Sequence, residues 1–161
     1  LAGAHHTLAE FHQVMERLVR MEDSQYSYRN TLLATNSEGI TAGIIVSYDG
    51  AKLKALRQRF IEEAKATFGI DYTGMDPETQ EGELYIDSLA VPAAFRGKGI
   101  AKMLLKAVIE KGREMGLPAV GLLVDKGNPK AERLYANMGF EYVNDAVWGG
   151  HSMKHLQYPL R

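Results

Sequence analysis

Hydrophobic residues recur at helical spacing in three segments, and each segment is expected to form a helix with one buried face. The first two cover residues 7–21 and 51–68, and the third begins at Ile100 and stops before Gly116-Leu117-Pro118. A fourth helix is marked by its ends, because Asn128 is a good N-cap residue and Gly139 suits the left-handed position after a helix. The first two apolar stripes are Leu8, Phe11, Met15, Leu18 and Val19, and then Leu53, Leu56, Phe60, Ile61, Ala64 and Phe68.

Shorter apolar segments between these helices predict strands. The segments "NTLLATN" and "GITAGIIVSYDG" are expected to form a hairpin around the turn Asn36-Ser37-Glu38-Gly39. "ELYIDSLAV" at 83–91 and "AVGLLVD" at 119–125 alternate with the later helices, and "FEYV" and "HSMKHLQYPL" close the chain as two antiparallel strands. This order predicts an α/β fold, with residues 1–161 forming one domain in which a mixed sheet carries helices on both faces.

The strand at 83–91 carries two carboxylates on one face. Alternation places Glu83, Tyr85, Asp87 and Leu89 on that face, and Leu84, Ile86 and Ser88 on the other. Four residues of strand separate Glu83 and Asp87 by about 13 Å, so they are not expected to form a tight pair. The preceding loop at 69–83 is acidic and has no Lys or Arg; it either attracts a cationic substrate or is simply solvated.

Charge and composition exclude several classes of protein. A net charge of −1 gives no general attraction to nucleic acid or to an anionic membrane. The absence of cysteine excludes disulfides, thiolate zinc sites and a cysteine nucleophile, and it favours a reducing compartment, which we expect to be the cytoplasm. No apolar segment approaches the roughly 18 residues needed to span a bilayer. The chain begins at Leu1 rather than at Met, which is compatible with a missing leading segment, a signal peptide included.

The third helix has an unusual beginning, because "FRGKGIA" places two glycines flanked by cations at its start. A helix N-terminus offers free backbone N–H groups and a partial positive charge, and glycine lets a phosphate approach those N–H groups closely. The segment therefore predicts a phosphate-binding turn. The dinucleotide-binding fingerprint fails, because Lys102 stands where its third glycine belongs, and the chain has no Walker loop.

The arrangement Arg96-x-x-Gly99-x-Ala101 resembles the pyrophosphate-binding [Gln/Arg]-x-x-Gly-x-[Gly/Ala] segment of the GNAT superfamily of acyl-CoA-dependent N-acetyltransferases. Two longer blocks, "LAVPAAFRGKGIA" and "NPKAERLYANMGFEYV", resemble the same family, and the resemblance covers residues 83–143. It implies a mostly antiparallel sheet that is splayed at the central strand. Two features depart from the family pattern: residues 1–30 supply a helix without the usual leading strand, and the segment at 51–82 is longer than a minimal member needs.

The resemblance also implies where acetyl-CoA would bind. Backbone groups of Leu89, Ala90 and Val91, at the end of the splayed strand, would hold the pantetheine arm and polarise the thioester carbonyl. Asn128 would contact CoA or serve only as a helix cap. The pyrophosphate would lie on Arg96, Gly97, Lys98, Gly99, Ile100 and Ala101.

Three residues are candidates for catalysis under the same resemblance. Tyr135 would protonate the departing CoA thiolate, since a phenol stays protonated at neutral pH; alternatively it is a packing residue. Asp87 is the better candidate for the base, with a relaying water, and Glu83 is the second; alternatively Asp87 orients the substrate cation or satisfies a buried turn. The Trp148-Gly149-Gly150 connection would close over the acceptor, or is only a loop. No metal site is expected, because no metal-binding pattern joins His5, His6, His12, His151 and His155.

The predicted function is an acetyl-CoA-dependent N-acetyltransferase that moves an acetyl group from the thioester to a primary amine by direct attack in a ternary complex. The alternative is a GNAT-shaped module that binds acyl-CoA as a sensor or scaffold; the presence of Tyr135 and Asp87 favours the enzyme. A nucleotide-binding α/β domain is a third reading and lacks its fingerprints. The acceptor is a small-molecule or peptide amine, and its identity, the acyl length and the oligomeric state, a homodimer included, are left open.

Overall fold

Six strands form one mixed sheet in the order β1-β2-β3-β4-β6-β5. The computed structural model describes residues 7–161. All neighbouring strands of this sheet are antiparallel except β3 and β4. The mixed, mostly antiparallel sheet predicted from the sequence is confirmed. The strands are β1 (Thr31–Thr35), β2 (Thr41–Asp49), β3 (Leu84–Ala90), β4 (Ala119–Asp125), β5 (Glu141–Trp148) and β6 (His151–Pro159).

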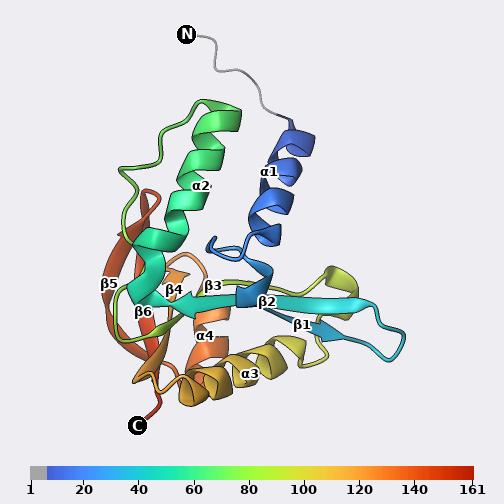
Figure 1. The fold of residues 1–161 in the computed structure, drawn as a ribbon. Helices are drawn as coiled ribbons and strands as arrows, with labels where there is room; N and C mark the ends of the chain where they lie inside the picture. The colour runs from blue at the N-terminus through green and yellow to red at the C-terminus, as the bar shows by residue number, and fades with distance from the viewer. Residues whose placement is uncertain (1–6) are drawn as a thin grey trace.

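Helices cover both faces of the sheet, as predicted (Figure 1). In that view α1 and α2 lie above the sheet, and α3 and α4 lie below it. The helices are α1 (Leu8–Arg20), α2 (Leu53–Phe68), α3 (Ile100–Glu114) and α4 (Pro129–Met138), with short 3₁₀ turns at Tyr28–Asn30, Gly50–Lys52 and Ala93–Phe95. No helix within residues 7–161 is long and apolar enough to cross a membrane.

Local sequence signals explain most of the element ends. Thr7 and Glu10 form a reciprocal capping box at the start of α1, and Asn128 accepts the N–H of Ala131 at the start of α4. The turn between β1 and β2 is closed by Asn36, whose side-chain oxygen accepts two backbone N–H groups, and by Gly39 at φ +78°. One boundary differs from the prediction: β5 continues to Trp148 rather than ending near residue 143.

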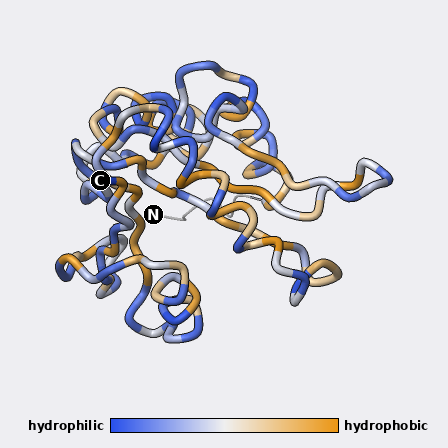
Figure 2. Tube along the Cα trace, turned by 90° about the horizontal axis from the view of Figure 1, so that it is seen from below, coloured by the Kyte–Doolittle hydropathy of each residue, from blue (hydrophilic) through white to orange (hydrophobic). Residues whose placement is uncertain are grey.

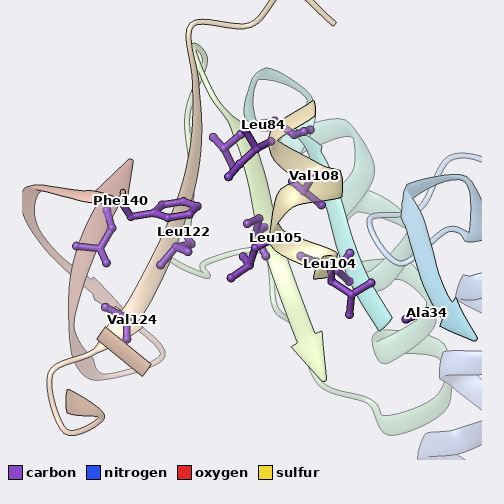
Figure 3. Packing of buried hydrophobic residues seen from close by; sticks show 13 residues of the cluster. Ala34, Leu84, Leu104, Leu105, Val108, Leu122, Val124 and Phe140 are labelled. Carbon is purple, nitrogen blue, oxygen red and sulfur yellow. The ribbon is translucent and has the colours of Figure 1, made fainter. Parts of the chain in front are cut away.

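The main hydrophobic core lies between the sheet and the lower helices. Figure 3 shows Leu105 and Val108 of α3 beside Leu84 of β3, with Phe140 across the cluster. The tube in Figure 2 is hydrophobic mainly in the middle of the molecule and hydrophilic mainly in the outer loops. A smaller cluster on the upper face contains Tyr48, Leu53 and Tyr85. The lower face therefore supplies most of the apolar burial, whereas the upper face buries polar groups as well.

The central strands β3 and β4 separate after a short contact. They pair at Leu84 with Val120 and at Tyr85 with Gly121, and at no later residue of the described chain. The splay implied by the family resemblance is therefore present. The strand β3 also carries a bulge, because Ile86 and Ser88 face consecutive residues of β2 and leave Asp87 without a partner.

The bulge corrects one expectation about β3. Simple alternation placed Leu89 on the same face as Asp87, but Leu89 packs against the lower core together with Leu84 and Ile86. The extra residue at Asp87 shifts the alternation by one position for the rest of the strand. Tyr85 and Asp87 remain on the upper side, where they meet Tyr48.

Candidate active site

The start of α3 forms an open cradle of backbone N–H groups. Gly97 and Gly99 have φ +77° and +78°, a conformation that side chains other than glycine rarely adopt. A Cβ at either glycine would meet nothing within 4 Å, and no side chain in the described part of the chain caps the helix. The first N–H groups of α3 are therefore available to an anion. A cavity of about 210 Å³ adjoins them and is lined by Val91, Phe95, Arg96, Ile100, Lys102 and Leu134, among others.

Two cations flank this cradle. Arg96 donates its Nε to the carbonyl oxygen of Val91 at 3.0 Å, which ties the end of β3 to the start of the cradle. The ammonium of Lys98 lies 5.6 Å from the centre of the Phe95 ring. Both cationic side chains belong to exposed residues, so they can reach an anionic ligand. The bond to Val91 occupies part of a carbonyl that we expected to serve the pantetheine arm, although a carbonyl oxygen can accept a second bond.

The end of β3 next to the cradle has one unpaired edge. Leu89 and Ala90 pair with Ile45 and Ile44 of β2 on one side. On the other side β4 has already diverged, so this edge of β3 has no strand partner in the described chain. An extended ligand can add to such an edge through backbone hydrogen bonds. The splay and the cradle therefore form one continuous surface.

Tyr135 of α4 is half-buried beside the core. Its ring meets Phe140 edge-on, at 5.9 Å between centroids and 64° between planes. Burial raises the pKa of Tyr135, so its phenol is protonated at neutral pH. Its hydroxyl makes no hydrogen bond to any residue within 7–161, which leaves it available to a ligand. Asn128 does cap α4, and its contact with CoA stays a prediction.

Asp87 is held on the upper face by three donors. Its Oδ2 accepts from the Gln25 amide and from the Tyr48 hydroxyl, each at 3.1 Å, and its Oδ1 accepts from Ser88 at 2.9 Å. The residue is half-buried, so it retains contact with solvent. Asp87 therefore combines a fixed orientation with partial access, as a base that works through a water molecule requires.

Glu83 is placed differently from our expectation of a catalytic role. It is 0% exposed, and its carboxylate accepts from Thr79 at 2.6 Å, from His155 at 2.7 Å and from Gln157 at 2.9 Å. Burial raises the pKa of Glu83, but the bonds from His155, Thr79 and Gln157 outweigh burial and leave the pKa below its usual value. A carboxylate enclosed in this way does not reach a substrate. The geometry therefore assigns Glu83 to the link between β3 and β6.

Comparisons with known proteins agree with this geometry. A sequence profile described as the acetyltransferase (GNAT) family matches residues 54–140, more than half of the chain. The chain belongs to the GNAT acetyltransferase family. A crystal structure of an acetyltransferase superposes with a TM-score of 0.83 at 29% identity, over 96% of this chain and 82% of that one. An N-acetyltransferase from Staphylococcus aureus Mu50 gives 0.81 at 26% identity, over 95% and 82%.

Curated GNAT relatives match over shorter segments. An acetyltransferase of Agrobacterium fabrum is 42% identical over 70 residues, which is 44% of this chain and 50% of that protein. A mycothiol acetyltransferase of Propionibacterium freudenreichii is 34% identical over 88 residues, 53% of this chain and 28% of that protein. The match thus spans half or less of the length of these relatives. These matches give the family of the chain and not its substrate.

Sequence reasoning missed the residues that surround Asp87. Glu78 was part of a loop expected to be solvated or to attract a cation, yet it is only 8% exposed. Arg57 of α2, 7% exposed, bonds Glu78 at 3.2 Å and also holds the backbone carbonyl of Asp76 at 3.0 Å. The position of Arg57 between Leu53 and Ala64 on the buried side of α2 was the available signal. A cation in an apolar stripe requires a buried partner.

The acidic loop and the last hairpin meet in the structure. Trp148, Gly149 and residues of the loop line a cavity of about 280 Å³. The Nε1 of Trp148 is buried and has no hydrogen-bond partner within residues 7–161. The other lining residues are Tyr72, Gly74, Met75 and Asp76.

The histidines form no metal site in the described residues. His151 lies 3.3 Å from Asp125, and His155 contacts Glu83. His5 and His6 fall outside the described residues, so nothing is concluded about them.

Proposed function

We propose that the chain is an acetyl-CoA-dependent N-acetyltransferase that transfers acetyl directly to a primary amine of a small molecule or peptide. The observation that carries this proposal is the uncapped glycine start of α3 beside the unpaired edge of β3. Together they offer N–H groups for a diphosphate and a strand edge for the pantetheine arm. The GNAT relatives support the same reaction class.

The residues fit the binding of acetyl-CoA, whose thioester supplies the acetyl group. The N–H groups between Gly97 and Ala101 would hold the diphosphate, with Arg96 and Lys98 adding positive charge. The backbone from Leu89 to Val91 would hold the pantetheine arm. A donor from this backbone would also polarise the thioester carbonyl. These contacts orient the carbonyl carbon toward the acceptor.

Asp87 and Tyr135 would move the protons of the reaction. Asp87 accepts a proton from the acceptor ammonium, directly or through a water, and the neutral amine forms the new C–N bond to the carbonyl carbon. The C–S bond breaks, and Tyr135 donates its proton to the departing thiolate. After the attack the nitrogen carries two protons, of which one passes to solvent and the other stays in the amide. Asp87 releases its proton to solvent, and the Tyr135 phenolate is reprotonated from solvent. The products are the acetylated amine and the free CoA thiol.

A thiol-release assay with acetyl-CoA over a panel of amines tests the reaction, run beside a thermal-unfolding assay with CoA. We expect thiol release that depends on both acetyl-CoA and one class of amine. A CoA-dependent rise in unfolding temperature without thiol release would favour the alternative, an acyl-CoA sensor or scaffold. If CoA causes no thermal shift and no thiol is released, the proposed binding site is wrong.

The cysteine-free sequence further supports a reducing compartment, and we propose the cytoplasm as the location.

A further inference from the structure

Two carboxylates from distant parts of the sequence share their hydrogen-bond donors on the upper face of the sheet. The Tyr48 hydroxyl lies 3.1 Å from Asp87 Oδ2 and 3.4 Å from Glu78 Oε1. The Gln25 amide nitrogen lies 3.1 Å and 3.3 Å from the same two oxygens. Asp87 and Glu78 are therefore close neighbours. Two negative charges so close together in a buried setting are unfavourable.

The charges around the two carboxylates do not balance if both are ionised. Arg57 is the cation that contacts Glu78, and its guanidinium neutralises one carboxylate. Burial, and the nearby Asp87 and Glu78, raise the pKa of each neighbouring phenol, so the phenols stay neutral. One proton shared by the carboxylates makes the cluster neutral. The titratable and charged groups that face Glu78 are Arg57 of α2, Tyr48 of β2, Tyr85 and Asp87 of β3, and Tyr26 of the segment before β1.

Burial indicates which carboxylate holds the proton. Glu78 is 8% exposed, whereas Asp87 is half-buried and keeps contact with solvent. Burial disfavours the charged form of a carboxyl group, so the proton belongs on the more buried Glu78. Gln25 turns its amide donor toward both carboxylates, although this leaves its buried Oε1 without a partner in the described chain, and this orientation favours a negative charge on the pair.

We propose that Glu78 and Asp87 hold one proton between them, carried by Glu78, and that Glu78 is thereby a positioning residue that keeps Asp87 anionic toward the acceptor. The catalytic part of this inference rests on the proposed function. The titration of Glu78 agrees with it: burial and then the charge of Asp87 raise its pKa, against the opposing effects of Arg57 and Tyr85. When Glu78 loses its proton at higher pH, Asp87 gains a negatively charged neighbour.

The first experiment follows the side-chain carboxyl ¹³C signal of Glu78 in the wild-type protein as the pH is raised. Assignment through the backbone makes the measurement independent of any variant. We expect a midpoint above the ordinary glutamate value of about 4.5. A midpoint at or below that value would overturn the proton assignment.

The second experiment compares the thermal stability of wild type, Glu78→Gln and the control Glu81→Gln, whose residue is exposed on the same loop. A raised pKa means that the folded protein holds a proton that the unfolded chain releases above about pH 4.5. Wild type therefore loses stability as the pH rises through the pKa of folded Glu78, and Glu78→Gln does not. The difference in unfolding temperature between Glu78→Gln and wild type should increase by up to about 4 °C per pH unit. This increase is expected between about pH 4.5 and the pKa of folded Glu78. Glu81→Gln should show no such trend, and a flat or falling difference for Glu78→Gln would contradict the proposal.

The third experiment measures the pH profile of kcat/KM for thiol release with an amine that the panel identifies. The ionisation of the amine is common to all three proteins, so a difference between profiles belongs to the enzyme. We expect wild type and Glu81→Gln to share a step at the Glu78 midpoint, and Glu78→Gln to lack it. Coinciding profiles would remove the catalytic role of Glu78. If wild type releases no thiol with any amine, the proposed function fails, while the carboxyl titration still decides the shared proton.

Discussion

Asp87 and Glu83 show how far the surroundings of a side chain decide its chemistry. Both belong to the same segment of chain, but Asp87 is half-buried beside polar donors, whereas Glu83 is enclosed between β3 and β6. The first can exchange protons with a ligand or with water. The second can only stabilise the fold, and Gly121 leaves the room for it, because a Cβ there would overlap the Glu83 carboxylate.

The replacement Glu83→Gln should lower stability in a pH-dependent way. The pKa of Glu83 is depressed in the folded state, so its contribution is present above the unfolded value of about 4.5 and is lost as the pH falls through the folded value. We expect a loss of about 2 kcal/mol at pH 7, because a buried charged acceptor is removed. Chemical denaturation at several pH values measures it. The difference in the free energy of unfolding between wild type and Glu83→Gln should become smaller as the pH falls. A difference that stays constant with pH would contradict the charge-based explanation.

The hydroxyl of Tyr135 should affect turnover far more than binding. Tyr135→Phe keeps the contact with Phe140 and removes the proton that the thiolate requires, so kcat should fall about 100-fold. The affinity for acetyl-CoA, measured by calorimetry, should change little. Tyr158→Phe is the matched control, because Tyr158 also packs against Phe140, at 5.7 Å. Equal turnover of the Tyr135 variant and wild type would assign Tyr135 to packing alone.

Among the elements, α3 has two roles: its buried side packs in the core, and its N-terminus faces the proposed ligand site. Its buried side supplies Leu104, Leu105 and Val108 to the core, which fixes its position under β3. Its N-terminus is then held at the mouth of the splay with no side-chain cap from the described residues. Helices usually satisfy these N–H groups with a Ser, Thr, Asp or Asn cap. Glycine at this position leaves the groups to a ligand.

Gly99→Ala should weaken the binding of acetyl-CoA about tenfold, because a methyl group would enter the cradle. The left-handed conformation should also cost about 1 kcal/mol of stability. Gly39→Ala is the control, since Gly39 has the same φ of +78° and an equally open surrounding in the β1–β2 turn. Both variants should lose similar stability, and only Gly99→Ala should lose affinity. Equal affinities in the two variants would contradict a cradle at Gly99.

In the molecule as a whole, the proposed acetyl-CoA surface joins parts of the chain that belong to different elements. It runs from β3 to the start of α3 and to Tyr135 of α4, while the sheet itself is split between β3 and β4. The core below the sheet connects these parts, since α3 and α4 pack on the same cluster. A ligand that spans them adds contacts across the split.

CoA should therefore stabilise the whole protein against heat. At a concentration 100 times its dissociation constant, a ligand of the folded state adds about 2.7 kcal/mol, which for a chain of this size corresponds to about 5–10 °C. Thermal unfolding followed by circular dichroism measures the shift. Dephospho-CoA retains the diphosphate and should act similarly, whereas pantetheine should act weakly. A shift as large with pantetheine as with CoA would show that the diphosphate cradle contributes little.

Local interactions allowed the sequence to predict the helices, the hairpin and the glycine start of α3. Caps, turns and apolar periodicity depend on residues within a few positions of one another, as at Asn128, Gly139 and Asn36. The family resemblance added the mostly antiparallel character of the sheet and its splay. Two local errors remained: the end of β5 and the face of Leu89, which depends on a bulge fixed by the opposite strand.

The sequence by itself determined that this chain is a mixed α/β domain with a glycine start to one helix, because those features are encoded within short stretches. The tertiary structure alone decided which polar groups surround each carboxylate. Glu83 meets His155 from 72 positions away, and Glu78 shares donors with Asp87 that come from Gln25 and Tyr48. Burial and charge pairing at such distances arise only when the strands have been placed side by side, since no local pattern specifies which polar groups will meet.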